Sequence, residues 1–247
     1  MEGRGITSHS RRERFRTTEW SLVVAAGSSR DPASRQALER LCSIYWYPVY
    51  GFVRGHGHDA SAAQDLAQEF FLRLIEKRAL GAASRERGRF RSFLLASVKN
   101  FLANERDRER AARRGGGCTF LPLDSQSGEI RYSREPVDNR TPDKAFEKRW
   151  ALALLDRALD RLREEAGRRE NPERFARLSR FLTEDSPEVS YRQIANDLGM
   201  TEAAVKAAIH RLRKRFGQLL RDEVGRTVDD PARIDEEIRY LFTAMEP

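Results

Sequence analysis

A basic face runs along one predicted helix in residues 190–221, which read SYRQIANDLGMTEAAVKAAIHRLRKRFGQLLR. Val205, Ile209 and Leu212 recur there at helical spacing and predict one buried stripe. The opposite side carries ammonium, guanidinium and imidazole groups, whose N–H donors can bind phosphates and base edges. The residues predicted to face DNA are Thr201, Glu202, Ala203, Lys206, His210, Arg211, Arg213 and Lys214, with Arg215 predicted to hold a phosphate.

The residues before this helix complete a helix-turn-helix pattern. Ser190 and Gln193 have the spacing of a capping box, which predicts a short first helix. Gly199 can adopt the left-handed conformation that ends this helix, and Thr201 can cap the next one. Small residues at the start of the second helix favour close approach to a major groove. The alternative is an ordinary solvated basic helix, for which the turn and both caps would be coincidences.

A second arginine-rich segment spans residues 85–114, with ten basic residues against four acidic ones. Phe90 and Phe93 alternate with its arginines. Opening a duplex requires new partners for unstacked bases and cations for the single-stranded backbone, and such a segment can supply both. Most of the phenylalanines are more simply explained as core residues, so a base pocket is better sought in residues 80–89.

The charge of the whole chain also favours a polyanionic partner. The formal net charge is +8 and the sequence pI is about 9.8. Residues 222–247 reverse this balance, with eight acidic residues against three arginines. The positive charge is therefore concentrated in two segments, and a negative tail follows them.

The pattern of helix starts predicts an all-α protein. A capping residue followed by proline suits the N-cap and the first helical position. This pair occurs at Asp31-Pro32, Thr141-Pro142, Asn171-Pro172 and Asp230-Pro231, and no stretch shows sustained alternation of apolar and polar residues.

Apolar periodic segments fall into two blocks on either side of a glycine-containing stretch. We therefore expect two helical domains joined by a flexible linker, with a helical extension at the end. The expected boundaries are an N-terminal extension with a short helix at 1–30, a bundle at 31–112, the linker at 113–141, a helix-turn-helix domain at 142–225 and an acidic helical tail at 226–247.

Several other classes of function lack their sequence signals. The chain has no nucleotide-binding loop, no metal-spaced carboxylate cluster and no nucleophile with its base, so we predict no enzyme, cofactor or metal. No run approaches the roughly 18 apolar residues of a membrane span. The first residues lack a secretory signal, which predicts a cytoplasmic protein without a membrane partner. Cys42 and Cys118 do not have the spacing of a disulfide framework or a zinc site.

The sequence resembles the extracytoplasmic-function group of the bacterial sigma factor family. Residues 191–200, with 205–206 and 210–213, are similar to region 4.2, which reads the minus-35 promoter element. Residues 65–74, DLAQEFFLRL, are similar to region 2.2, which docks on the clamp helices of RNA polymerase. This resemblance implies polymerase contacts at Asp65, Leu66, Gln68, Phe71, Leu72 and Arg73.

The surface of that polymerase-docking helix can be predicted from its spacing. Asp65, Gln68 and Arg73 lie away from an apolar stripe, and Phe71 and Leu72 lie at the border of this polar face. An exposed aromatic residue beside polar groups is a common anchor of protein interfaces.

Residues 89–95 and 99–102 are similar to regions 2.3 and 2.4, which capture the melted minus-10 element. Phe93 departs from the family, in which tryptophan is frequent at the matching position, so the resemblance assigns no stacking role to Phe93. The DNA contacts implied by this part of the resemblance are Arg87, Arg89, Arg91, Lys99, Asn100 and Arg106.

The resemblance implies a non-enzymatic initiation subunit without a cofactor. Its partners would be promoter DNA and core RNA polymerase, through the clamp helices and the flap, and it allows a separate anti-sigma protein or other regulator. A helix-turn-helix regulator that does not contact polymerase is the alternative.

The acidic tail is predicted to form an amphipathic helix that starts near Asp230-Pro231. We expect this helix to cap a domain core, and our hypothesis is that it also folds over a basic DNA-binding surface. Its apolar face would carry Ile234, Ile238, Leu241 and Phe242, and its other face Asp235, Glu236 and Glu237.

Overall fold

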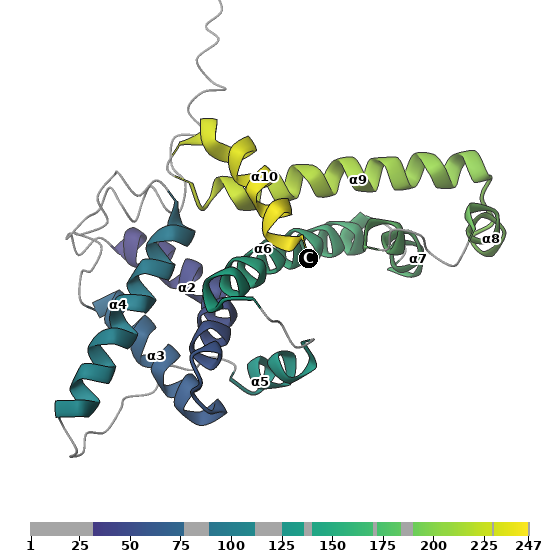
Figure 1. The fold of residues 1–247 in the computed structure, drawn as a ribbon. Helices are drawn as coiled ribbons and strands as arrows, with labels where there is room; N and C mark the ends of the chain where they lie inside the picture. The colour runs from purple at the N-terminus through teal and green to yellow at the C-terminus, as the bar shows by residue number, and fades with distance from the viewer. Residues whose placement is uncertain are drawn as a thin grey trace, which may run out of the picture. The chain divides into compact units, whose positions relative to one another are not determined.

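The protein is represented by a computed structural model, which describes residues 32–76, 89–111, 125–135, 140–169, 172–183, 190–228 and 230–246. The regular structure of these residues is helical (Figure 1). An antiparallel bridge between Arg89 and Val228 is isolated and does not extend into a strand. The predicted all-α class is therefore confirmed. The short helix expected in the N-terminal extension, Cys118 and residues 80–88 lie outside the described residues.

The helices divide between two compact units. Unit 1 is built from the described residues of 32–153 and 225–246, and unit 2 from those of 154–224. Unit 1 contains α2 (Pro32–Gly55), α3 (Ala60–Glu76), α4 (Phe90–Ala111), α5 (Ser125–Arg134), the first part of α6 (Pro142–Arg169), the 3-10 turn η4 (Pro231–Arg233) and α10 (Ile234–Met245). Unit 2 contains the rest of α6, α7 (Pro172–Thr183), α8 (Tyr191–Asp197) and most of α9 (Glu202–Gly225).

Each of the four predicted capping-residue and proline pairs marks an observed helix start. Proline is the first residue of α2, α6, α7 and η4. At α6 the amide of Lys144 donates to the hydroxyl of Thr141 at 3.4 Å, and at η4 the amide of Ala232 donates to the carboxylate of Asp230 at 2.9 Å. These local contacts satisfy backbone donors that the first turn of a helix leaves open.

The core of unit 1 is rich in aromatic side chains. Tyr45 of α2 packs against Phe90 of α4 and Trp150 of α6, with ring centroids 5.2 Å and 6.3 Å apart, and all three residues are buried. Because Trp150 shares this core, the first part of α6 belongs to unit 1. The units therefore do not coincide with the expected domain boundary at residue 142.

Part of the stretch expected to be a linker is the helix α5, which contacts α2. Glu129 of α5 accepts hydrogen bonds from the Tyr50 hydroxyl and from Arg54, the latter at 3.1 Å. Burial and the hydrogen bond to Glu129 raise the pKa of Tyr50. This part of the segment therefore packs on the bundle as an element of unit 1.

The residue that follows α5 makes a second set of contacts. Glu135 accepts a hydrogen bond from the Tyr47 hydroxyl at 2.5 Å and one from Arg149 at 2.7 Å. Arg149 is buried, and a buried guanidinium requires a carboxylate partner. Glu135 supplies this partner.

The core of unit 2 joins α7, α8 and α9. It is formed by Leu178, Ile194, Val205 and Ile209 together with Phe181 and two buried alanines. Near the end of α9, the buried carboxylate of Glu223 accepts hydrogen bonds from Arg157 and Arg161 of α6, at 3.0 Å and 2.7 Å. Apolar packing and this carboxylate therefore fix α9 against the other helices of unit 2.

The predicted turn between α8 and α9 is confirmed. The amide of Gln193 donates to the Ser190 hydroxyl at 3.2 Å, and the amide of Ala204 donates to the Thr201 hydroxyl at the same distance. Gly199 has a φ of +61°, the left-handed conformation that glycine adopts at little cost. Local sequence chemistry therefore sets both helix starts and the turn.

The structure also describes Cys42, His56 and the features that bear on metal binding and membrane spans. Cys42 is buried in α2, and burial raises the pKa of its thiol. The Nδ1 atom of His56 lies 2.9 Å from the Phe52 carbonyl oxygen. The part of the chain that the structure describes has no group of three His, Cys, Asp or Glu residues arranged to hold a metal ion. Within the same residues, no helix combines the length and apolarity that crossing a membrane requires.

Candidate functional site

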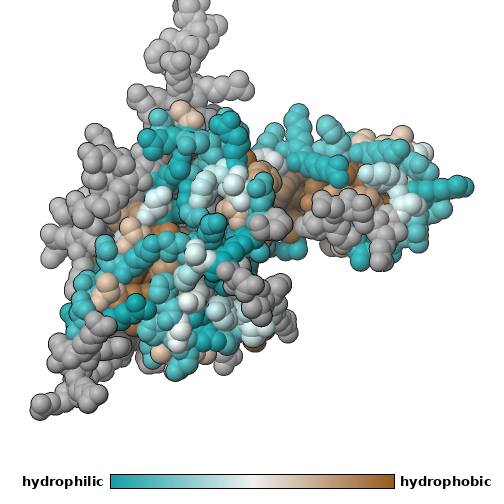
Figure 2. Space-filling view, viewed as in Figure 1, coloured by the Kyte–Doolittle hydropathy of each residue, from teal (hydrophilic) through white to brown (hydrophobic). Residues whose placement is uncertain are grey.

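The basic face of α9 lies open to solvent. Figure 2 shows hydrophilic side chains along the outer side of α9, with apolar side chains in the furrow beneath it. The small residues Ala203 and Ala207 are exposed near the start of the helix, so a ligand can approach the backbone closely. All the residues of this face that were predicted to meet DNA are exposed: Thr201, Glu202, Ala203, Lys206, His210, Arg211, Arg213 and Lys214.

Two cations of this face have partners within unit 2. The ammonium of Lys206 lies 5.5 Å from the centre of the Tyr191 ring on α8, a cation–π distance that favours one orientation of the side chain. Arg213 donates to the carbonyl oxygen of Phe181 at 3.0 Å. Lys206 therefore remains available to a ligand. Arg213 keeps further N–H donors for a ligand, but its hydrogen bond to Phe181 restricts where its guanidinium can lie.

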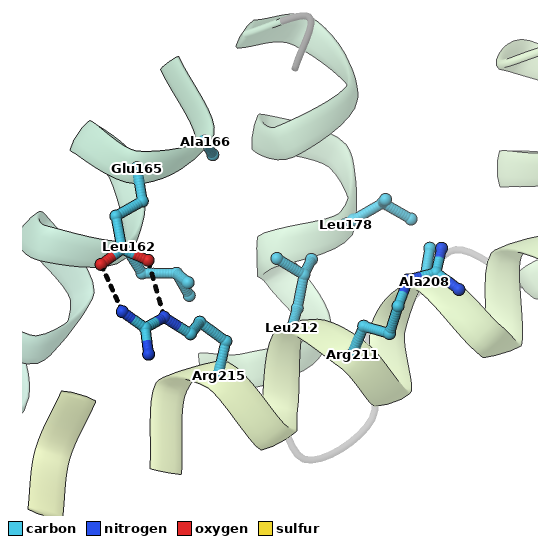
Figure 3. Close-up of a pocket in the computed structure, with 8 residues that line it drawn as sticks. All are labelled: Leu162, Glu165, Ala166, Leu178, Ala208, Arg211, Leu212 and Arg215. Carbon is cyan, nitrogen blue, oxygen red and sulfur yellow. Dashed lines mark hydrogen bonds and ion pairs between the residues drawn. The ribbon is translucent and has the colours of Figure 1, made fainter. Parts of the chain in front are cut away.

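Arg215 does not match the predicted role of holding a phosphate. Its guanidinium donates to both carboxylate oxygens of Glu165 on α6, at 2.7 Å and 2.6 Å (Figure 3). The hydrogen bond to Glu165 raises the pKa of Arg215. A two-pronged carboxylate pair occupies the donors that a phosphate would need, so Lys214 is the better phosphate contact on this side of α9.

A cleft lies beside this ion pair, between α6, α7 and α9. Its volume is about 230 Å³. The cleft walls are mostly apolar, and the Glu165–Arg215 pair forms one end (Figure 3). Such a cleft can accept an apolar side chain from another molecule. Its lining residues are Leu162, Glu165, Ala166, Leu178, Ala208, Arg211, Leu212 and Arg215.

The helix predicted to dock on polymerase is α3. Fewer of its predicted contact residues are exposed than expected from the sequence. Asp65 is exposed, and Leu66 and Leu72 are half-buried. Phe71, however, is only 1% exposed and Gln68 only 9%. The prediction of an exposed aromatic anchor at Phe71 is therefore wrong.

The burial of Phe71 has a packing cause. Its ring lies 5.1 Å from that of Phe70, which in turn packs on Phe101 of α4 at 5.7 Å. Because α3 contacts both α2 and α4, its apolar surface is wider than a single stripe. The two consecutive phenylalanines both lie in this core.

Arg73 links α3 to α4. Its guanidinium forms ion pairs with Glu69 and Glu105, and lies over the Phe101 ring at 5.2 Å from the ring centre. Three partners hold this side chain in place, and 22% of it is exposed. In the free chain Arg73 therefore stabilises the helix pair.

The residues predicted to meet the minus-10 element divide into two groups on α4. Lys99, Asn100 and Arg106 are exposed along the helix, and Lys99 forms an ion pair with Asp143. Arg89 and Arg91 lie at the start of the helix and are largely enclosed by other parts of unit 1. Arg87 lies outside the described residues.

Arg91 is buried between two aromatic rings and two carboxylates. Its guanidinium lies 3.9 Å from the centre of the Tyr240 ring and 5.4 Å from that of Trp150. It donates to Glu237 and to Glu147, each at 3.0 Å. This arrangement joins α4, α6 and α10, and leaves the Arg91 residue 5% exposed.

Arg89 pairs with one exposed carboxylate and one buried carboxylate. Its Nη2 atom lies 2.6 Å from Glu236 Oε1, and 57% of the Glu236 side chain is exposed. Its Nε atom lies 3.0 Å from Glu237 Oε2, but the two groups do not align as a hydrogen bond. The hydrogen bond and charge of Arg89 lower the pKa of the Glu236 carboxyl.

The C-terminal helix presents different faces from those predicted. Glu237 was expected on the exposed polar face, but it is fully buried, and Phe242 is 52% exposed. Ile234, Glu237 and Leu241 have the spacing of one helical face, and all three are buried. This spacing could have predicted that Glu237 is buried and therefore needs a partner such as Arg91. The negative charge of Glu237, however, favoured the prediction of an exposed side chain.

Comparison with known proteins gives one family match. Residues 47–112 match Sigma-70 region 2, which is about a quarter of the 247-residue chain. No curated protein and no solved structure matches the chain. The matched residues contain α3, α4 and the end of α2, and region 2 domains of the sigma-70 family bind core RNA polymerase and promoter DNA. The chain therefore contains a Sigma-70 region 2 domain, which supports its placement in the sigma-70 family.

Proposed function

We propose that the chain is a sigma factor of the extracytoplasmic-function group, which binds core RNA polymerase and directs promoter recognition and melting. The match of residues 47–112 to Sigma-70 region 2 carries this proposal. It covers the two helices to which a polymerase contact and a minus-10 contact are assigned. A family that acts by binding also agrees with the charge of the chain, +8 at neutral pH.

The polymerase contact is assigned to the exposed side of α3. Among the charged residues of α3 whose side chains are described, Asp65 is the exposed one, and Leu66 and Leu72 supply half-buried apolar area beside it. Gln68, Phe71 and Arg73 act through the packing of α3, since the first two are nearly buried and Arg73 is paired. The clamp helices of polymerase are the proposed partner of this surface.

The minus-35 contact is assigned to α8 and α9 as a helix-turn-helix. Ala203, Lys206 and His210 are exposed at the part of α9 that would lie deepest in a major groove. Lys214 lies further along the same helix and would neutralise a phosphate. The apolar cleft between α6, α7 and α9 is the proposed contact for the polymerase flap, because its walls can accept an apolar side chain.

The minus-10 contact is assigned to α4. Lys99, Asn100 and Arg106 are exposed along it and combine two cations with an amide. Such groups hold a single-stranded backbone without reading its sequence.

Reconstitution with core polymerase tests the proposal. The Asp65→Lys variant should lose binding to core polymerase, because it reverses the exposed charge of α3 without disturbing the core. Glu164→Lys makes the same change of charge at an exposed position of α6 and is the control. The control should bind polymerase as the unmodified chain does, and both variants should fold alike.

The possible outcomes separate the two function classes. If the unmodified chain binds DNA but not core polymerase, the sigma factor proposal fails and a helix-turn-helix regulator remains. If the chain binds polymerase and Asp65→Lys binds equally well, the assignment of the contact to α3 fails.

A further inference from the structure

The start of α4 carries cations that the chain neutralises with its own C-terminal helix. Arg89 and Arg91 pair with Glu236 and Glu237 of α10, residues that are well over a hundred positions away in the sequence. All four residues belong to unit 1. A nucleic-acid phosphate that approached these arginines would therefore compete with a carboxylate for the same donors.

The two arginines differ in how firmly the carboxylates are held. Arg91 lies between two rings, and the Glu237 side chain that binds it is 1% exposed. Separating this pair would leave the buried Arg91 with Glu147 alone and the buried Glu237 with only its misaligned contact to Arg89, which is strongly unfavourable. Arg91 is therefore inaccessible to DNA as long as α10 remains packed on unit 1.

The attachment of α10 does not depend on the ion pairs alone. Ile234 and Leu241 are buried in it, as are Thr227 and Val228 just before it. The backbone amide of Phe90 also donates to the carbonyl oxygen of Thr227 at 2.9 Å. The helix is therefore part of the folded unit, and any opening must be local.

The Arg89–Glu236 pair meets the conditions for a local opening. More than half of the Glu236 side chain is exposed, so its carboxylate can return to water without leaving a buried charge. The second contact of Arg89, to Glu237, lacks hydrogen-bond alignment. A phosphate oxygen can therefore replace Glu236 while Arg91 and the rest of α10 stay in place.

We propose that Glu236 occupies, in the free chain, the position of a single-stranded DNA phosphate on Arg89, and that DNA displaces it. The inference rests on the proposed function, because it assumes that α4 meets melted DNA. It goes beyond that function by naming the residue that restrains the contact. It also removes Arg91 from the set of DNA contacts.

Binding of the full chain to mixed-sequence single-stranded DNA, followed by fluorescence anisotropy over a salt series, tests this inference. Glu236→Gln should bind about 2- to 5-fold more tightly at low salt, since an exposed ion pair opposes binding only modestly. The slope of log affinity against log salt should steepen by at most about 1. Glu164→Gln removes the same charge from an exposed position of α6 and should change neither quantity as much.

A double-mutant cycle makes the result specific to Arg89. In an Arg89→Ala background, Glu236→Gln should give no gain, because the competing pair no longer exists. A gain that persists there, or one that Glu164→Gln matches, overturns the inference. If the unmodified chain binds neither DNA nor core polymerase, the proposed function fails first, which is a different outcome.

Discussion

The two basic surfaces of the chain differ in what balances their charge. On α9 of unit 2, Lys206, His210 and Lys214 are exposed, and no carboxylate of the described residues forms an ion pair with them. At the start of α4 in unit 1, Arg89 and Arg91 are paired with carboxylates of the same chain. The cations of α9 can therefore bind a polyanion directly. The arginines at the start of α4 must first release a carboxylate of their own chain.

This difference shows that cations counted in a sequence do not measure the charge available to a ligand. Within each unit, some arginines are structural: Arg91 is buried in unit 1, and Arg215 donates two hydrogen bonds to Glu165 in unit 2. The available charge depends on which carboxylates the fold brings close. Substitutions on the closed surface, where carboxylates pair with the arginines of α4, should therefore differ in effect from substitutions on the open surface, where the cations of α9 are exposed.

The largest effect is expected from opening the closed surface. Glu237→Ala should lower the free energy of unfolding of the full chain by about 3 kcal/mol, because it leaves the buried Arg91 with one carboxylate partner. Glu165→Gln, at the partly exposed pair with Arg215, should cost no more than about 1 kcal/mol. Urea unfolding at neutral pH measures both. Equal losses would mean that the two arginines are held in the same way.

Substitutions on the open surface should change which DNA is preferred. Lys206→Ala and His210→Ala should each reduce discrimination at one base pair of the minus-35 element, by about 1–3 kcal/mol for a well-aligned contact. Lys214→Ala should weaken all sequences alike and reduce the salt slope by about 1. Binding measured against a promoter library distinguishes these effects. A uniform loss for all three variants would remove the assignment of base contacts.

A glycine-to-alanine substitution should reduce the stability of unit 2 more in the turn between α8 and α9 than within α9 itself. Gly199→Ala should destabilise unit 2 by about 1 kcal/mol, because an alanine at a φ of +61° is strained although the site is open. Gly217→Ala is the matched control: it lies in an open site within α9, where alanine should stabilise by about 0.5–1 kcal/mol. Thermal unfolding of both variants checks the opposite signs. A loss at both positions would contradict the role of the turn.

The smallest effect concerns the pH dependence of the Arg89–Glu236 pair. Arg89 lowers the pKa of Glu236, so the pair is formed at neutral pH and is lost as the pH falls through that lowered pKa. Arg89→Ala should return the pKa of Glu236 towards the ordinary value of a glutamate. Carbon NMR of labelled glutamate side chains measures the shift. An unchanged pKa would show that the pair does not persist in solution.

Local features of the fold were determined by the sequence itself. The proline starts of α2, α6 and α7, the caps at Ser190 and Thr201, and the conformation of Gly199 all depend on neighbouring residues. The exposure of the predicted α9 face follows from helical spacing, because one helix buries one stripe against its own unit. These features involve short separations along the chain, so their chemistry can be read directly.

Only the tertiary structure decided which polar groups meet across long separations. Phe71 is buried because α3 is covered by two helices, a fact that the spacing within α3 does not contain. Arg91 and Glu237 are 146 positions apart, and α5 reaches α2 through carboxylates that looked like part of a polar linker. The physical reason is that a charged side chain has the same sequence signal whether water or an opposite charge solvates it. Packing of distant elements decides between the two.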